Sequence, residues 1–309
     1  MNLLNDRVMM VLPIYHPDHR LIQLLESINR QKEVIFGLYI IDSGSSISYV
    51  LHIHEHIPFF IRHIDSSTFN HGGTRQKSVE ECFKSEFIIF MTQDAVLEND
   101  LSLHNLLQAF QDDQVGAAYG RQIPNPDAYC LAAHARLYNY SEKSHIQQIS
   151  DVPKLGIKVA FMSNSFAAYR RKALMSVGGF PVHVILGEDT YVAAKMILEK
   201  WKISYRADAK VYHSHNYSIF EECRRYFDTG VFHGKEPWME KSFGHVNHEG
   251  VRFLQSQLRY IWKYDPRMIF QALIRDVLDF FFFQAGKREN LLPQFIKIKM
   301  SMTKKYWHR

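Results

Sequence analysis

The pattern of apolar and polar positions in the first 100 residues predicts strands that alternate with helices. Continuous apolar runs, each closed by a polar or turn-forming stretch, place strands at residues 8–15, 34–41, 59–64 and 87–91. Amphipathic or polar stretches between these runs place helices at residues 21–28 and 74–84. Strands that are apolar throughout and alternate with helices indicate an α/β fold with a mostly parallel, Rossmann-like sheet covered on both faces.

The pattern changes along the rest of the chain. Residues 120–180 look irregular, a helix is predicted at 189–201, and residues 207–212 form an extended approach to His213. Beyond residue 220 the spacing is helical, with a stripe from Val251 to Ile261 and an apolar stretch at 268–283. We therefore predict an α/β domain over residues 1–220 and a helical extension over residues 221–309.

Composition narrows the class of protein only slightly. A chain of 309 residues with 46% hydrophobic and 22% charged residues has ordinary globular composition. The net charge of +5 suits an anionic partner such as a diphosphate, a nucleic acid or an acidic lipid surface. Cys82, Cys130 and Cys223 lack the spacing of a disulfide framework or zinc knuckle, which favours a reducing compartment. No signal-peptide pattern opens the chain and no apolar stretch reaches the ~20 residues of a spanning helix, so we expect a cytoplasmic protein.

Polar groups follow the predicted strands at one edge of the sheet. Tyr15, Asp42 and Asp94 all lie at or just past a strand end, and ligands gather outside the carboxyl ends of such strands. Asp94 could hold a hard cation against substrate phosphates, or could cap the following turn. Asp42 could bind a ribose or base, although an Asx turn is the simpler reading of Asp-Ser-Gly-Ser.

A second acidic group lies in Gly187-Glu188-Asp189, at the predicted start of a helix. A carboxylate here could deprotonate an acceptor hydroxyl, or could simply cap the helix. His213 follows 24 residues after Asp189, and His215 would share its face on a strand. Such a pair could bind zinc but lacks further soft ligands at a recognisable spacing. We favour His213 as a ligand because Asp94 and Asp189 accompany it in the sequence.

A glycine-containing turn at residues 70–75 leads into the helix predicted at 74–84. Asn70, His71 and Arg75 flank two glycines there, and helix N-terminal amides favour anions. Arg75 could bind a phosphate in a bidentate manner. The segment matches neither a Walker loop nor a dinucleotide fingerprint, so an ordinary turn stays open.

In order and spacing, these segments resemble the family 2 inverting glycosyltransferases of the GT-A fold, and among them bacterial rhamnosyltransferases. The match runs from about residue 8 to residue 220. The segments that carry it are residues 12–15, 42–45, 69–75, 92–95, 120–122, 163–164, 178–181, 187–189 and 213–217.

The resemblance implies roles for individual residues. Asp94 matches the last acid of the family's DxD motif and is expected to bind Mg²⁺ or Mn²⁺, with His213 completing the metal site. Asp189 matches the general base, and Glu188 beside it is a candidate second acid. Nucleotide-sugar contacts are expected from Pro13, Tyr15, Asp42, Arg75, Gln93 and Asp94. Contacts with the donor or acceptor sugar are expected from Asn70, His71, Arg121 and Asn164.

One departure concerns the metal. Thr92 stands where the family has the first acid of its motif, which implies weak metal binding that depends on the substrate's phosphates. The implied reaction is a single displacement, in which Asp189 deprotonates the acceptor and the configuration of the anomeric carbon inverts. The implied donor is dTDP-L-rhamnose, and the implied acceptor is a polyprenyl-diphosphate-linked glycan of O-antigen or capsule biosynthesis.

The C-terminal extension combines apolar and aromatic residues with a basic tail. This composition suits a helix in an anionic membrane interface, so we expect a peripheral protein on the inner face of the cytoplasmic membrane. The alternative is a helical cap over the catalytic core. No nucleic-acid-binding pattern is present.

Two other functions fit parts of the sequence. One is a non-catalytic protein that binds nucleotide sugars or carbohydrate on the same fold, for which Thr92 leaves room. The other is a sugar-phosphate nucleotidyltransferase, which would normally open with a glycine-rich basic loop rather than Pro13 to Pro17.

Overall fold

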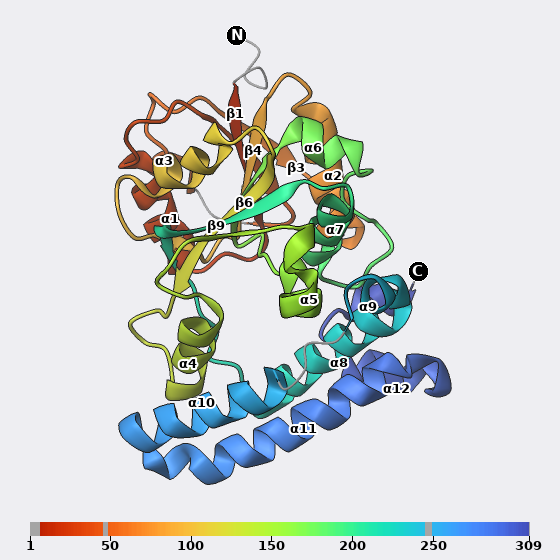
Figure 1. The fold of residues 1–309 in the computed structure, drawn as a ribbon. Helices are drawn as coiled ribbons and strands as arrows, with labels where there is room; N and C mark the ends of the chain where they lie inside the picture. The colour runs from red at the N-terminus through yellow and green to blue at the C-terminus, as the bar shows by residue number, and fades with distance from the viewer. Residues whose placement is uncertain (1–6, 46–48, 245–248, 309) are drawn as a thin grey trace.

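A single mixed sheet forms the centre of the computed structural model, which describes residues 7–45, 49–244 and 249–308 (Figure 1). Within these residues the strand order is β3-β2-β1-β4-β8-β6-β9-β5, and β7 adds to β9. The strands are β1 (Val8–Ile14), β2 (Gly37–Asp42), β3 (Phe59–His63), β4 (Phe87–Met91), β5 (Val96–Leu97), β6 (Val115–Ile123), β7 (His145–Gln147), β8 (Phe166–Arg170) and β9 (Lys202–Tyr212).

The parallel part of the sheet brings the ends of four strands to one edge. β1 pairs in parallel with β2 and β4, and β2 pairs in parallel with β3. The register sets Ile14 opposite Asp42 and Asp42 opposite His63, while Asp94 follows the end of β4. The predicted strands at 8–15, 34–41, 59–64 and 87–91 are confirmed, with ends shifted by up to three residues.

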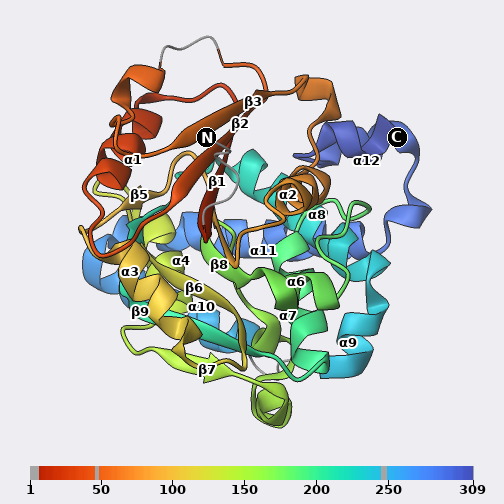
Figure 2. The same cartoon turned by 90° about the horizontal axis from the view of Figure 1, so that it is seen from above.

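Two apolar layers cover the sheet because neighbouring residues of a strand point to opposite faces. Met10 and Leu12 of β1 pack with α1 (His19–Asn29) and α3 (Ser102–Leu107). Met9 and Val11 belong to the other layer, with α2 (His71–Glu81), α6 (Arg171–Ser176) and α7 (Glu188–Leu198) (Figure 2). Strand residues buried on both faces explain the unbroken apolar runs in the sequence.

The middle of the chain is more regular than the sequence indicates. Residues 120–180 were expected to be irregular, but they contain the end of β6, α4 (Cys130–Asn139), β7, α5 (Val152–Leu155), β8 and α6. The strands β6 and β8 are hard to recognise in the sequence because they contain small residues, which close packing requires at these positions. A Cβ at Gly120 would lie 2.3 Å from the Phe166 ring and 2.5 Å from the Ala209 carbonyl oxygen. Such strands lack the β-branched residues that usually mark a strand.

Five α-helices follow the last strand in the described part of the chain. They are α8 (Ile219–Lys235), α9 (Pro237–Phe243), α10 (Glu249–Tyr264), α11 (Ile269–Lys287) and α12 (Gln294–Met300). α8 and α11 cross at glycines, since a Cβ at Gly230 would lie 2.1 Å from the Phe283 carbonyl oxygen and one at Gly286 2.1 Å from that of Phe227. α10 and α11 run side by side across one end of the molecule (Figure 1).

The C-terminal tail returns to the part of the molecule that contains the sheet. Asp228 of α8 accepts hydrogen bonds from the amides of Met302 and Thr303, and Trp307 is buried in the core. Lys305 donates to the Ser66 carbonyl oxygen (2.7 Å), and its Nζ lies 5.7 Å from the centre of the Tyr15 ring. The tail therefore stabilises the same core that supports the sheet.

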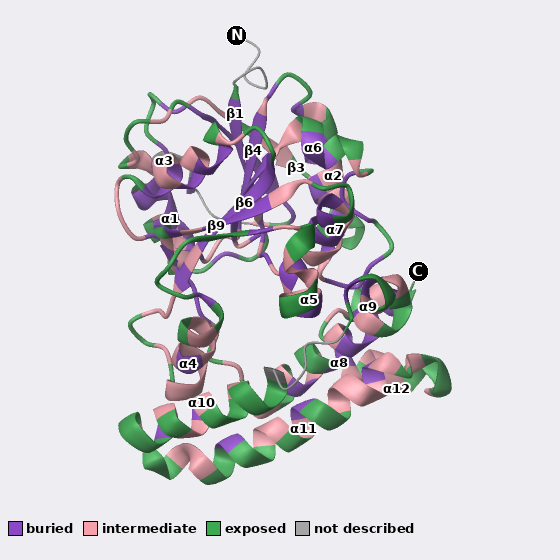
Figure 3. Cartoon of the chain, in the orientation of Figure 1, coloured by how far each residue is buried: buried purple, intermediate pink, exposed green. Residues whose placement is uncertain are grey.

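The helical end exposes several large apolar side chains. Figure 3 shows exposed positions along α10 and α11, and those of α11 include Phe270 (75% exposed) and Phe281 (62%). Across the residues that can be described, we find no helix with the length and apolarity needed to span a membrane. The three cysteines are free thiols.

Candidate active site

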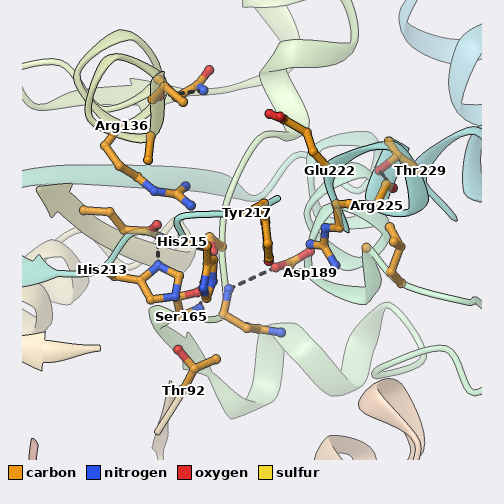
Figure 4. Close-up of a pocket in the computed structure, with 18 of the residues that line it drawn as sticks. Thr92, Arg136, Ser165, Asp189, His213, His215, Tyr217, Glu222, Arg225 and Thr229 are labelled. Carbon is orange, nitrogen blue, oxygen red and sulfur yellow. Dashed lines mark hydrogen bonds between the residues drawn. The ribbon is translucent and has the colours of Figure 1, made fainter. Parts of the chain in front are cut away.

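A cavity of about 690 Å³ lies between the sheet and the C-terminal helices. Its walls come from the segment after β4, from α4, from the start of α7, from the residues after β9 and from α8 and α11. Seven residues predicted to form the site line it, namely His71, Arg75, Asp94, Asn164, Glu188, Asp189 and His213. The fold therefore gathers the main chemical groups singled out in the sequence around one space (Figure 4).

One side of this cavity carries Asp94, His213 and His215. Asp94 Oδ1 lies 3.5 Å from His213 Nε2, and Asp94 Oδ2 lies 3.7 Å from His215 Nδ1. One ligand atom from each residue lies within 4.8 Å of the others. The short strand β5 brings them together, because it follows Asp94 and pairs Val96 with Tyr212, the last residue of β9.

A hydrogen-bond chain sets the protonation of His213. The side-chain nitrogen of Gln122 donates to Ser163 Oγ (3.0 Å). The side-chain oxygen of Gln122 therefore points toward His213 Nδ1, at 2.8 Å. Nδ1 must then carry the hydrogen, so the Nε2 lone pair faces Asp94. Fixing the tautomer through the second nitrogen is how proteins orient metal-ligating histidines.

The electrostatics of the cluster fit a divalent cation. Burial lowers the pKa of His213 and lowers that of His215 to about 3, so both rings are neutral near pH 7. Burial would raise the pKa of Asp94, but at the low pH where this carboxyl group titrates the His213 ring is protonated, and its hydrogen bond and positive charge outweigh burial and hold the pKa of Asp94 below its usual range. Two neutral imidazoles and one carboxylate form a donor set for a transition-metal ion, whereas Mg²⁺ prefers oxygen ligands.

Asp189 opens α7 and faces the same cavity. Gly187 reaches the helix with a φ of 76°, a left-handed conformation that favours glycine. Asp189 Oδ2 accepts a hydrogen bond from the backbone amide of Asn164 (3.0 Å), and Oδ1 accepts one from the backbone amide of Thr190 (2.8 Å). The residue remains partly exposed. Burial, and next the negative charge of Glu188, raise the pKa of Asp189 to about 6. This carboxyl group can therefore exchange a proton near neutral pH.

Glu188 differs from Asp189 in being buried and paired. Its Oε1 accepts from Arg75 (2.8 Å) and from the Asn164 side-chain amide (3.2 Å). Burial opposes ionisation, but the Arg75 charge outweighs it and lowers the pKa of Glu188. The pKa values of these two adjacent carboxyl groups are therefore moved in opposite directions, so Asp189 can take up a proton near neutral pH while Glu188 stays charged.

The residues predicted to contact the nucleotide lie mainly at the neighbouring edge of the sheet, outside the lining of the cavity. The side-chain amide of Gln93 binds the backbone of Tyr15. It accepts a hydrogen bond from the Tyr15 backbone nitrogen (2.8 Å) and donates one to the Tyr15 carbonyl oxygen (2.9 Å). Asp42 makes the alternative Asx turn, accepting from the Gly44 and Ser45 amides, and also accepts from Tyr49. The Tyr15 ring is 47% exposed. Pro13 lies within β1 opposite Ile41.

The remaining predicted residues have varied surroundings. Asn70 caps α2 by accepting from the Gly73 amide (2.6 Å) and donates to the Val182 carbonyl oxygen. Arg75 lines the cavity, but its guanidinium is engaged by Glu188. Arg121 pairs with Glu142 at 3.1 Å and is not part of the cavity lining.

Sequence reasoning missed several groups of the site. His215 was not predicted as a ligand, although its alternation with His213 is visible in the sequence. Asp94 lies next to both rings because β5 pairs with β9, and the sequence does not show that pairing. Gln122 lies in one of the segments that carry the family resemblance, but its role was not predicted because that role depends on contacts with Ser163 and His213. Arg136 and Arg225 also line the cavity. They were not predicted, because arginines are common in any sequence and no motif marks these two.

Comparison with known proteins identifies the chemistry. The family model described as "Glycosyl transferase family 2" matches residues 10–178, more than half of the chain. The chain belongs to this family. The predicted enzyme class, a glycosyltransferase, is thereby confirmed, as is the predicted kinship with rhamnosyltransferases in the relatives that follow.

The alignments with two curated relatives cover more of the chain than the family model does. The chain is 42% identical to the "O-antigen chain rhamnosyltransferase RfbN" of Salmonella typhimurium, over 98% of this chain and 96% of the relative. It is 46% identical to the "O-antigen chain rhamnosyltransferase WbaN" of Salmonella anatum, over 79% and 78%.

Solved structures confirm the GT-A fold. The mannosyltransferase PcManGT from Pyrobaculum calidifontis, in complex with GDP-Man and Mn²⁺, aligns with a TM-score of 0.61 over 92% of this chain and 87% of that one, at 14% identity. TarS of S. aureus, in complex with UDP-GlcNAc, aligns with a TM-score of 0.53 over 93% and 92%, at 12% identity. At these identities the likeness concerns the fold alone.

Proposed function

We propose that this glycosyltransferase is an inverting rhamnosyltransferase of O-antigen biosynthesis. It would transfer L-rhamnose from dTDP-L-rhamnose to a hydroxyl group of a polyprenyl-diphosphate-linked glycan. The names of the relatives at 42% and 46% identity support the donor sugar and the pathway. The observation that carries the reaction is Asp189, a carboxyl group of raised pKa that faces the cavity holding Asp94, His213 and His215.

Each residue has a defined task in the proposed reaction. Asp189 accepts the proton of the acceptor hydroxyl, held in place by the Asn164 amide. The oxygen attacks the anomeric carbon from the face opposite the diphosphate, and the C–O bond to the diphosphate breaks, so the configuration inverts. Arg75 keeps Glu188 ionised; the negative charge of Glu188 raises the pKa of Asp189, and the positive charge of Arg75 partly opposes this rise. Tyr15, Gln93, Asp42 and Pro13 border the nucleotide.

We further propose that Asp94, His213 and His215 hold a divalent cation, which supplies charge neutralisation for the departing diphosphate. The two imidazoles favour Mn²⁺ over Mg²⁺. With Thr92 in place of a second acid, only one carboxylate serves the cation. The affinity of the free protein for the ion is then low, and the donor's phosphates supply further oxygen ligands.

The helical end would rest on the inner face of the cytoplasmic membrane. An apolar stripe runs along α11, each member at least 41% exposed, formed by Phe270, Leu273, Ile274, Val277, Phe280 and Phe281. Exposed basic residues of α10 and the following turn flank it, namely Arg252, Arg259, Lys263 and Arg267. Apolar side chains beside cations fit an anionic lipid surface.

The direct test is a screen of nucleotide sugars for donor hydrolysis and transfer, with and without Mn²⁺. We expect turnover of dTDP-L-rhamnose that requires the ion. Turnover of another nucleotide sugar would overturn the assigned donor. Binding of nucleotide sugars with no turnover of any of them would favour the non-catalytic binding protein instead.

A further inference from the structure

Lys305 of the C-terminal tail lies at the edge of the sheet where we place the nucleotide. Its ammonium group donates a hydrogen bond to the carbonyl oxygen of Ser66 (2.7 Å), which follows the end of β3. The same Nζ atom lies 5.7 Å from the centre of the Tyr15 ring. The tail thus adds a cation to an edge whose other proposed members are neutral or acidic.

The backbone on both sides of Lys305 is anchored to the core. Asp228 of α8 accepts hydrogen bonds from the amides of Met302 and Thr303, at 3.0 Å each. Trp307 is only 7% exposed, whereas Lys305 between these two anchors is exposed. The anchors therefore bring an exposed lysine to the nucleotide edge and hold it there.

Tyr15 forms a flat platform beside this ammonium group. The side-chain amide of Gln93 binds the Tyr15 backbone at both its nitrogen and its oxygen. The His16 ring packs edge-on against the Tyr15 ring, with ring centres 4.2 Å apart. An aromatic ring that is held in place and 47% exposed suits the stacking of a nucleobase. A base stacked there would lie within reach of Lys305.

The position of Lys305 along the edge matches the base rather than the diphosphate. Asp94, in the cluster that we propose for the cation and the diphosphate, follows β4, whereas Ser66 follows β3. The strand order β3-β2-β1-β4 puts three spacings of about 4.8 Å, or about 14 Å, between these two strands. A nucleotide whose diphosphate lies at Asp94 therefore extends its nucleoside toward Lys305.

Lys305 also has hydrogens left for a ligand. An ammonium group carries three, and Ser66 takes one of them. Within residues 7–45, 49–244 and 249–308, its Nζ makes this one hydrogen bond and no ion pair. Hydrogen bonds from Ser67 lower the pKa of Asp65, and the charge of Lys305 adds to that effect without a direct contact.

Asp42, the acidic residue at this end of the edge, is already occupied. Its carboxylate accepts hydrogen bonds from the amides of Gly44 and Ser45 and from the hydroxyl group of Tyr49, and the residue is 2% exposed. Its oxygens therefore present little surface to a ligand. Lys305, by contrast, is an exposed donor that can contact a base directly.

We infer that Lys305 donates a hydrogen bond to the O4 carbonyl oxygen of a pyrimidine base stacked on Tyr15, and so helps to select the nucleotide. O4 lies at the end of the base opposite the sugar, as Lys305 lies at the end of the edge opposite Asp94. Thymine and uracil carry a carbonyl oxygen at this position, whereas cytosine carries an amino group, which cannot accept from an ammonium group. The inference rests on the proposed function, because the donor's nucleotide must bind along this edge.

The test compares nucleotides that differ in the base. The full-length protein is titrated calorimetrically with dTDP, UDP and CDP in the presence of Mn²⁺. The variant is Lys305→Met, which keeps an unbranched side chain and removes the charge and the donors. Lys304→Met is the matched control, since Lys304 is the adjacent exposed lysine and makes no hydrogen bond or ion pair with the described residues.

We expect the wild type to bind dTDP and UDP more tightly than CDP. Lys305→Met should weaken the binding of dTDP and UDP by about tenfold and change that of CDP by no more than about twofold. The control should bind all three as the wild type does. Unchanged affinities in Lys305→Met would overturn the inference. An equal loss for all three nucleotides would also overturn it, since the lysine would then serve a part of the ligand that they share or support only the fold.

The titration separates this inference from the proposed function, because it needs neither rhamnose nor an acceptor. A smaller preference for dTDP over CDP in Lys305→Met would support the inference even if the wild type transferred no rhamnose. Transfer of rhamnose with the same preference in the wild type and Lys305→Met would support the proposed function and overturn the inference. A wild type that binds none of the three nucleotides would overturn both.

Discussion

Asp189 and Glu188 are neighbours in sequence, yet their surroundings give them opposite protonation behaviour. Glu188 is buried against Arg75 and stays charged, whereas Asp189 accepts hydrogen bonds from two backbone amides and lies beside the negative charge of Glu188. The pKa of Asp189 is about 6, so the fraction of ionised base rises as the pH rises through 6. We therefore expect the transfer rate to fall below about pH 6.

Replacing the fixed charge tests this coupling. Glu188→Gln removes the negative neighbour of Asp189 and should lower its pKa, which moves the acid limb of the kcat profile by about one unit to lower pH. Glu199→Gln, at the exposed end of the same helix, should leave the limb in place. If the acid limb of the kcat profile does not move in Glu188→Gln, then Glu188 does not set the pKa of Asp189.

His215 offers a second test at the residue scale, because we propose it as a ligand from the structure and not from the sequence. His215→Ala should raise the Mn²⁺ concentration for half-maximal activity by about tenfold or more, since it removes one of three ligand atoms. His54→Ala, at an exposed position, is the control and should not change this concentration. An unchanged metal requirement in His215→Ala would restrict the site to Asp94 and His213.

At the scale of elements, the contact between α8 and α11 depends on glycines with no room for a methyl group. Gly286→Ala would place a Cβ 2.1 Å from the Phe227 carbonyl oxygen, so the helices must separate. We expect a loss of about 1–3 kcal/mol in unfolding free energy, measured by denaturant titration. Gly250→Ala in α10 has open space around its Cβ and should be neutral or stabilising by up to about 1 kcal/mol. Equal effects at both positions would contradict the tight crossing.

The same scale shows what the sequence could predict. The apolar strands β1 to β4 and the amphipathic α1 were readable because burial on one or both faces leaves a local pattern. β6 and β8 were not, since Gly120 and the alanines around residue 168 serve close packing instead of strand propensity. Asp94, Asp189 and His213 were predicted from the spacing of segments. His215, Gln122 and the arginines required contacts between elements far apart in the chain.

At the scale of the molecule, the tail and the exposed stripe of the helical end can be tested separately. The tail after residue 300 is bound to the core through Asp228 and Trp307, so deleting it would disturb the fold as well as any membrane contact. The exposed stripe of α11 contributes no such contacts at its outer positions. Substitutions on that stripe therefore test membrane binding without touching the tail.

We expect Phe270→Glu with Phe281→Glu to abolish sedimentation with liposomes that contain anionic lipids. Both side chains are exposed, so folding should be preserved and melting curves should match the wild type. Ile35→Glu with Phe83→Glu adds the same charge at exposed apolar positions elsewhere and should leave sedimentation unchanged. Equal sedimentation of both double variants would show that the stripe is not the lipid-binding surface.

The central claim is that Asp189 is the base of a glycosyl transfer, and the transfer rate of Asp189→Asn at saturating donor tests it most directly. The amide cannot accept the proton, so kcat should fall by about 100-fold or more while the dissociation constant of dTDP-L-rhamnose stays within about threefold. Asp113→Asn, at a fully exposed carboxylate, should transfer as the wild type does. A transfer rate for Asp189→Asn within about tenfold of the wild type would contradict the account.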